Sequence, residues 1–436
     1  MSVFAAVAVA AVASSRVSAE SLLLIEADSG KVLYAENATY PWYPASLTKL
    51  MTAYVVLHAV KEGRFTLDSL FTVSQFASVQ KPAKMGLPPG SQVTVDNALK
   101  MLMVRSANDV AVTIAENVSG SVENFADAMN AAAVHLGMTQ SSFVNPNGMP
   151  AEDQISSARD LAILARALIR EFPEYDYYWH VPAIRYGAKV TQNYNKLLGR
   201  YPGTDGMKTG FICASGFNLV ATATRNNRRL IAVVLGAPSS DSRSVKAAQL
   251  LERGFNGAGL AWLAPQLGTV ETLPAIAAAP PDLREAICGG HRRKPPAENE
   301  DDDDVASRKD DQKDPNGQQT FKLSNLGPSV KASSLLGPKV DAIPIEVYLG
   351  PSRKPAESQF AVTRAKLKAR REKAAKNAAS DPAIAQSAAT SAPSATTTDA
   401  PATPWLSFAP EKTQSPGDSG PRPMPVPRPR PKTNGQ

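Results

Sequence analysis

Histidine and cysteine are scarce in this chain of 436 residues, which has four of the first and two of the second. The histidines are His58, His135, His180 and His291. Their positions lack the spacing of metal ligands, so the sequence predicts no metal and no other cofactor. Two cysteines, Cys213 and Cys288, make no disulfide framework. Export would permit a disulfide between them. Because Cys288 follows the part of the chain with a folded composition, we expect both thiols to be free.

The N-terminal apolar run is too short for a transmembrane helix. It covers residues 3–13, whereas a bilayer span needs about 20 residues. The small residues Val-Ser-Ala follow at 17–19, which predicts a secretory signal peptide over 1–19 with cleavage before Glu20. The run lacks the preceding Lys or Arg of such signals, and an N-terminal core helix is the alternative. We expect export, to the periplasm or the wall-facing side of the membrane.

The charge balance is not extreme, with a formal net charge of +7 and a sequence pI of about 9.2. It favours anionic partners in general and selects none among wall polymers, phospholipid headgroups and nucleic acid. The basic stretches lack the interleaved aromatic residues on which nucleic-acid bases would stack, and the chain looks exported. Nucleic acid is therefore discounted as a partner.

The composition changes at about residue 264. Residues 20–263 have the composition of a folded domain, whereas residues 264–436 are rich in proline, alanine and charge and are predicted to be a largely disordered tail. Within it, the basic pattern at 360–379 predicts either peripheral contact with a membrane or the wall, or a solvated helix, and the second is favoured. The apolar stretch at 343–349 is either a partner-binding strand or has no function.

The folded part has strand-like patterns at both ends and helical patterns between them. Residues 21–36 predict a β-hairpin, and helical patterns follow at about 44–60, within 95–138 and at 157–172. Strand-like stretches return between 183 and 237, with Asn226-Asn227 in a turn, and a last helix begins at about Ser242. This order predicts an α+β domain in which one sheet is built from both ends of the chain.

The stretch PASLTKLMTAY at 44–54 has a lysine where a helical core is expected. Ser46 and Lys49 are three residues apart and share a helix face. The N–H groups at the helix start favour developing negative charge at Ser46. Burial and a second nearby cation would lower the pKa of Lys49, which could then accept the serine proton. The alternative is a lysine that extends to the surface, because about one Ser-x-x-Lys match is expected by chance.

Two further motifs follow in the chain. In Arg-Ser-Ala-Asn, either Ser106 or Asn108 taken alone is best interpreted as a helix N-cap. Lys208-Thr209-Gly210 is rarer, with about 0.1 chance matches in a chain of this length. On an edge strand, the lysine and the threonine hydroxyl could bind a carboxylate, and the glycine would let a substrate approach closely.

Ser-x-x-Lys, Ser-x-Asn and Lys-Thr-Gly in this order are the signature of serine penicillin-recognising enzymes. Over about residues 20–256 the chain resembles the D-alanyl-D-alanine carboxypeptidases, which are low-molecular-mass penicillin-binding proteins. The resemblance extends beyond the motifs, to stretches such as VRSANDVAVTIAENVSGS and QNYNKLLGRYPGTDGMKTGF. It implies a β-lactamase/transpeptidase-like α+β fold, in which helices flank a five-stranded antiparallel sheet and a helical lobe lies beside it.

The resemblance also implies an activity. The enzyme would remove the terminal D-alanine from peptidoglycan stem pentapeptides through an acyl-enzyme, and β-lactams would inhibit it covalently. Ser46 would be the nucleophile, Lys49 the general base and Ser106 a proton relay. The backbone N–H groups of Ser46 and Phe211 would form the oxyanion hole. The substrate-binding residues would be Asn108, Lys208, Thr209 and Gly210.

The sequence departs from the family pattern at two places. Members often have histidine where this chain has Phe211, and many add a β-rich domain and an amphipathic anchor that are not evident here. A class A β-lactamase would need a glutamate in a Glu-x-x-Leu-Asn context, which residues 138–150 lack. A DD-endopeptidase of the same family and a sensor or wall-binding module that acylates with little turnover remain alternatives.

Overall fold

The structure is a computed structural model, and it describes residues 20–256, 267–289, 335–338 and 341–352. The predicted signal peptide at 1–19 and the basic pattern at 360–379 lie outside the described residues.

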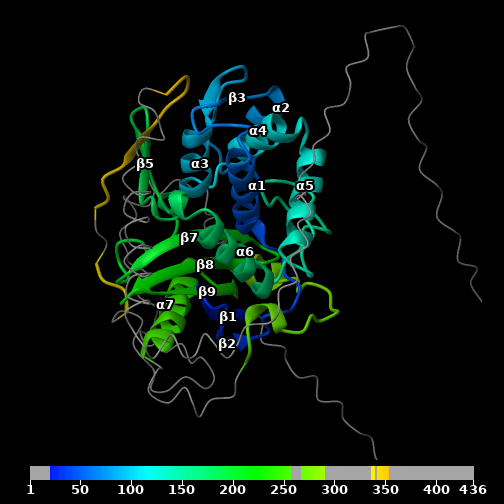
Figure 1. Ribbon diagram of the computed structural model, residues 1–436, viewed down its shortest axis with the longest axis vertical. Coiled ribbons are helices and arrows are strands. Elements are labelled where there is room, and N and C mark those ends of the chain that lie inside the picture. The colour runs from blue at the N-terminus through cyan, green and yellow to red at the C-terminus, as the bar shows by residue number, and fades with distance from the viewer. Residues whose placement is uncertain (1–19, 257–266, 290–334, 339–340, 353–436) are drawn as a thin grey trace, which may run out of the picture.

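The described residues form a mixed set of strands and helices (Figure 1). The strands are β1 (Ser21–Glu26), β2 (Val32–Glu36), β3 (Leu70–Thr72), β4 (Gln92–Thr94), β5 (Ala183–Tyr186), β6 (Lys189–Gln192), β7 (Thr204–Ile212), β8 (Gly216–Arg225), β9 (Arg228–Ala237) and β10 (Ile345–Val347). The α-helices are α1 (Lys49–Lys61), α2 (Gln75–Ser78), α3 (Val95–Val104), α4 (Asn108–Ser119), α5 (Val122–His135), α6 (Ala158–Glu171), α7 (Ser240–Asn256) and α8 (Arg284–Cys288). The 3₁₀ turns are η1 (Ala45–Thr48), η2 (Pro173–His180) and η4 (Val270–Thr272).

One antiparallel sheet joins the two ends of the domain, as the sequence predicts. Its strand order is β2-β1-β9-β8-β7, so the N-terminal hairpin lies beside strands that follow it by about 200 residues. β1, β8 and β9 are buried over most of their length, which explains why they are nearly continuous apolar runs. Asn226 and Asn227 turn the chain between β8 and β9 with φ of 49° and 62°, a conformation that asparagine tolerates well.

The helical lobe is built around α1 (Figure 1). α1 is apolar on all sides and every residue from Lys49 to Leu57 is buried, as expected for a helix enclosed by others. α3, α4, α5 and α6 pack against it, and α6 and α7 also pack against the sheet. Within the described residues, no helix combines the length and apolar character needed to cross a bilayer.

Several helices in this lobe begin at a side-chain cap that the sequence supplies. The side chains of Thr94, Ser121 and Ser157 each accept a hydrogen bond from the backbone N–H three residues later. Such caps satisfy N–H groups that have no partner within the helix. They fix where α3, α5 and α6 begin, and α3 leads directly into the Ser-x-Asn motif.

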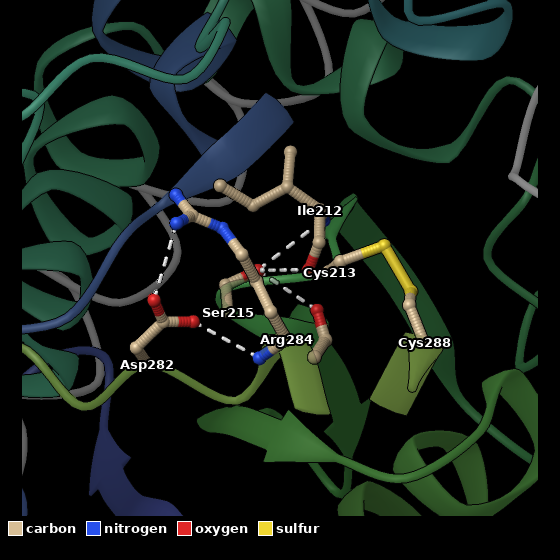
Figure 2. Close-up of a disulfide and its surroundings, with 7 residues drawn as sticks. Ile212, Cys213, Ser215, Asp282, Arg284 and Cys288 are labelled. Carbon is tan, nitrogen blue, oxygen red and sulfur yellow. Dashed lines mark hydrogen bonds and ion pairs between the residues drawn. A yellow bond between two sulfur atoms is a disulfide. The ribbon is translucent and has the colours of Figure 1, made fainter. Parts of the chain in front are cut away.

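The prediction of free thiols is wrong. Cys213, just after β7, forms a disulfide with Cys288 at the end of α8, across 75 residues of sequence (Figure 2). Leu283 also donates its N–H to the Ala214 carbonyl at 3.0 Å, and the side chain of Ile287 is buried in the core. The short helix α8 therefore packs on the end of β7, which explains how two distant cysteines meet.

A second segment beyond residue 264 also packs on the domain. β10, within the apolar stretch 343–349, pairs in parallel with β5 in a separate three-stranded sheet, and Val347 is 1% exposed. On either side of it, Gly337 donates its N–H to the Arg200 carbonyl at 2.8 Å, and Gly350 donates to the Gln92 carbonyl at 2.7 Å. Gly337 is thus attached to the loop before β7, and Gly350 is attached to β4 in the helical lobe. The described parts of the tail contribute to the fold, whereas the domain boundary near 264 stays a prediction.

Candidate active site

Ser46 lies in the 3₁₀ turn that leads into α1, and Lys49 is the first residue of that helix. Lys49 is fully buried. Its Nζ lies 3.0 Å from Ser46 Oγ, 2.9 Å from Asn108 Oδ1 and 2.5 Å from the Asn147 carbonyl oxygen. The expected contact between the serine and the lysine is therefore present, because three residues on a tight helical turn share one face.

The partners of Lys49 suit a general base. A neutral amine has two N–H donors and one lone pair, whereas an ammonium ion has three donors. The Asn108 amide oxygen and the Asn147 carbonyl can only accept, so each takes one N–H. In the structure Nζ donates to Ser46 Oγ. A neutral amine that kept its bonds to the two carbonyl acceptors would instead accept the Ser46 proton through its lone pair. The geometry accommodates the amine before proton transfer and the ammonium ion after it.

Ser106 and Asn108 lie in the connection between α3 and α4. Neither caps the helix, since α4 begins at Asn108 and its N-cap residue is Ala107, without a side-chain bond. Ser106 has φ of 59°, a left-handed conformation that costs a non-glycine residue about 1–2 kcal/mol. Its Oγ is buried and has no hydrogen-bond partner among the described residues. Strain and an unsatisfied hydroxyl together are typical of a site built for a ligand.

Asn108 connects the lysine to a neighbouring loop. Its Oδ1 accepts from Lys49, and its Nδ2 donates to the Lys81 carbonyl at 2.9 Å and approaches Met149 Sδ at 3.7 Å. Both ends of the amide are thus held, and the side chain is 5% exposed. This arrangement fixes the amide orientation that directs its oxygen at Lys49.

Lys208-Thr209-Gly210 lies in β7, which is the edge strand of the five-stranded sheet as far as the structure describes it. Lys208 and Thr209 are buried, and Lys208 Nζ donates to the Thr209 carbonyl at 2.9 Å. A Cβ at Gly210 would lie 2.9 Å from the Pro44 oxygen and 3.0 Å from the Ser46 nitrogen. Glycine is required there because β7 touches the backbone of the turn that carries Ser46.

Two functional neighbours were missed by the sequence analysis. Asn218 on β8 is fully buried, and its Nδ2 donates to the Tyr43 carbonyl at 3.0 Å. Arg243 on α7 is also buried, and its Nη1 reaches the carbonyls of Gly210 at 3.4 Å and Asn218 at 3.3 Å. They hold the Ser46 turn and the back of β7 in place. A single asparagine in an apolar strand was the available signal, since a buried amide there needs a partner.

Phe211 occupies the position after Lys-Thr-Gly and turns to the β8 side. Its ring stacks on Phe217 with centroids 4.2 Å apart, and it is only partly buried. The side chain therefore contributes apolar contact and no proton. No group of three or more metal-ligating side chains that could hold a metal ion occurs among the residues described.

Comparisons with known proteins show which family this chain is similar to. The family model of the D-alanyl-D-alanine carboxypeptidases matches residues 7–239. The chain belongs to this family. It is 38% identical over 245 residues to the D-alanyl-D-alanine carboxypeptidase DacA of Haemophilus influenzae and 41% identical over 247 residues to DacC of Escherichia coli. Each match covers 55% of this chain and 62% of the relative. The chain thus spans about six-tenths of the length of these carboxypeptidases.

Solved structures of family members confirm the expected fold. Penicillin-binding protein 5 from Haemophilus influenzae and penicillin-binding protein 6B from Escherichia coli are each 37% identical to this chain, with a TM-score of 0.52. Both comparisons cover 54% of this chain, and they cover 70% and 76% of the respective structures. The five-stranded antiparallel sheet with a helical lobe is therefore the carboxypeptidase fold.

Proposed function

We propose that this chain is a serine-type D-alanyl-D-alanine carboxypeptidase. It would remove the terminal D-alanine from peptidoglycan stem pentapeptides and be acylated by penicillin at the same serine. The observation that carries the proposal is the Lys49 amine, held by two acceptors and 3.0 Å from Ser46 Oγ. Membership of the family supports the substrate class. Its relatives include a D-alanyl-D-alanine carboxypeptidase and a penicillin-binding protein, which supports both the peptide and the penicillin.

In the acylation step, Lys49 takes the Ser46 proton as Oγ attacks the carbonyl carbon of the penultimate D-alanine. The negative charge that develops on the carbonyl oxygen would be stabilised by the N–H groups of Ser46 and Phe211. The contact between Gly210 and the Ser46 backbone supports this assignment, because it brings β7 against the same turn. The protein would then have both donors in place before the substrate binds.

When the carbon–nitrogen bond breaks, the leaving amine needs a proton. The proton would pass from the Lys49 ammonium through the Ser106 hydroxyl to that amine, which regenerates neutral Lys49. Water then attacks the ester and gives one proton to Lys49. The Lys49 ammonium returns that proton to Ser46 Oγ as the shortened peptide leaves. The buried, unpartnered Ser106 Oγ supports a relay, since a hydroxyl can accept one proton while it donates another.

The substrate's own groups would be held by the remaining motif residues. Lys208 and the Thr209 hydroxyl would bind the terminal carboxylate, and Asn108 would bind the peptide amide. Gly210 would act indirectly, because it lets β7 lie against the Ser46 turn and so places the peptide on β7 next to the serine. As an edge strand, β7 presents backbone groups to an incoming extended chain.

Two alternatives share this site. A DD-endopeptidase of the same family would use the same catalytic groups on cross-linked peptides. A penicillin-binding sensor with little turnover is favoured by Phe211, whose stacked ring contributes no proton to deacylation. The rate of deacylation separates the sensor from the two enzymes.

We also propose that the protein works outside the cytoplasm. The disulfide between Cys213 and Cys288 supports export, because such bonds persist in oxidising compartments. Contact of the basic tail with a membrane or the wall lies outside the described residues and is a separate prediction.

The test is release of free D-alanine from a purified pentapeptide muropeptide, with Ser46→Ala as the control. Release of one D-alanine per peptide by the wild type only is the expected result. Covalent penicillin labelling that survives in Ser46→Ala would contradict the nucleophile assignment. Labelling without D-alanine release would favour the endopeptidase or the sensor, and a cross-linked muropeptide then separates these two.

A further inference from the structure

The loop from Val144 to Met149 lies against the first turn of α1. Lys49 Nζ donates to the Asn147 carbonyl at 2.5 Å, and Thr52 Oγ1 donates to the Pro146 carbonyl at 2.6 Å. Two successive carbonyls of the loop are thus bound by α1. The first of them is an acceptor for the proposed general base, so the position of the loop affects the catalytic lysine.

Gly148 shows how closely the loop approaches. Its φ is 78°, and a Cβ there would lie 1.9 Å from the Ala45 carbonyl oxygen, next to Ser46. Asn145 holds the turn from inside, since its Oδ1 accepts from the N–H groups of Gly148 at 2.7 Å and Met149 at 3.1 Å. The turn has little freedom of its own, and its placement relative to α1 depends on what anchors its ends.

Gln154 anchors the start of the loop. Its side chain is buried, at 2% exposure. Its Oε1 accepts from the N–H groups of Val144 at 2.8 Å and Asn145 at 3.2 Å, at the start of the loop. Its Nε2 donates to Thr48 Oγ1 at 2.9 Å. One amide therefore ties the start of the loop to the residue directly before Lys49.

We propose that Gln154 is a positioning residue for the general base. By joining Thr48 to the loop, it sets the distance from the Asn147 carbonyl to Lys49 and thereby directs the lone pair of the amine at Ser46. Gln154 touches no substrate. This inference rests on the proposed function, because it assigns how Lys49 is held for proton transfer.

Loss of the anchor has a defined chemical consequence. An acceptor stabilises an ammonium ion more than an amine. If the Asn147 carbonyl moves away, the titration of Lys49 should shift to lower pH, and the amine should lose its fixed direction. A displacement of about 1 Å costs on the order of 100-fold in rate at an active site.

The test compares Gln154→Met, which keeps the length of the side chain and removes its polar atoms, with Asn130→Leu. Asn130 makes a matched control because it binds Phe143, one residue before the loop, through two hydrogen bonds of 2.8 Å. Lys49 is followed by carbon NMR of labelled lysine side chains over pH, and acylation by the rate of penicillin labelling. Melting temperatures report the structural cost of each variant.

We expect Gln154→Met to slow acylation by at least about tenfold and to move the Lys49 titration to lower pH. Asn130→Leu should lower the melting temperature and leave both readouts unchanged. Equal effects of the two variants, or an unchanged Lys49 titration in Gln154→Met, would overturn the proposal. If the wild type is not acylated by penicillin, the proposed function fails, and the Lys49 titration still decides the role of Gln154.

A second variant covers the case in which Gln154→Met does not fold. Gln154→Glu keeps acceptors for the loop N–H groups and can accept a hydrogen bond from the Thr48 hydroxyl. It also places a negative charge beside Thr48, the residue directly before Lys49. An opposite charge stabilises the ammonium form, so the Lys49 titration should shift to higher pH. A shift to lower pH, or none, would contradict the proposed coupling.

Discussion

Replacing both cysteines by serine should destabilise the protein by a predictable amount. The bond between Cys213 and Cys288 closes a loop of 75 residues. In the chain-entropy model, a loop of this size restricts the unfolded chain by about 15 cal/mol/K, or about 4.5 kcal/mol at 25 °C. Measured effects are often smaller, so the expected loss in the free energy of unfolding is about 2–4.5 kcal/mol.

The assay is urea unfolding of the oxidised wild type, the reduced wild type and the Cys213→Ser/Cys288→Ser variant. The reduced protein and the variant should unfold at similar urea concentrations, both below the oxidised protein. The rate of penicillin labelling in the folded variant should remain close to that of the wild type. β7 is held independently of the disulfide by Arg243 and by its pairing with β8.

Two results would refute this reasoning. One is a variant whose free energy of unfolding lies within about 0.5 kcal/mol of the oxidised wild type, the range of an ordinary surface substitution. The other is a protein, purified without reductant, that shows two free thiols on titration. Either result would mean that the bond between Cys213 and Cys288 (Figure 2) does not restrain the unfolded chain.

Three further changes give distinct results. Gly210→Ala places a methyl group 2.9 Å from the Pro44 oxygen, and should slow penicillin labelling by on the order of 100-fold; an unchanged rate would contradict the role of this contact. Val347→Asp buries a charge in β10 and should lower the free energy of unfolding, measured in urea, by at least about 2 kcal/mol. The control Ile343→Asp, at a residue that is 88% exposed, should change it by less than about 0.5 kcal/mol. Equal losses in the two variants would show that β10 does not pack as described. Burial alone would raise the pKa of Glu252, but the hydrogen bond from Arg225 Nη2 at 2.7 Å and the charge of that guanidinium lower it below its ordinary 4.5. The ionised carboxylate therefore stabilises the fold above that pH, and the contribution is lost as pH falls. Glu252→Gln should therefore flatten the pH dependence of stability below about pH 4.5, and an unchanged slope would contradict the shift.

The sheet could be predicted because its strands and one of its turns have recognisable local sequence patterns. β1, β8 and β9 are apolar runs bounded by turn residues, and Asn226-Asn227 marks a hairpin in any context. The contact between Ser46 and Lys49 was predictable for a similar reason, because a spacing of three on a helical turn fixes which side chains meet.

Long-range pairings could not be predicted in the same way. Nothing local indicates that Cys288 returns to the end of β7, or that Ile345–Val347 pairs with β5. Both segments come after a change to a polar, proline-rich composition, which is typical of disorder. Their apolar content is small, and only the partner surface shows that one or two buried side chains such as Ile287 and Val347 are enough to hold them.

Sequence motifs identify only some of the groups that make up the candidate site. The three motifs name the side chains that we propose react or bind, but one acceptor of Lys49 is the backbone carbonyl of Asn147, a group that every residue has. In the sequence, Gly148 is the residue that marks this carbonyl, because its φ is positive and a Cβ there would lie 1.9 Å from the Ala45 oxygen. The chemistry of the lysine therefore depends on a glycine and on a buried glutamine, Gln154, neither of which carries a reactive group. Residues of this kind are found by asking where each buried polar atom is satisfied, and that question needs the fold.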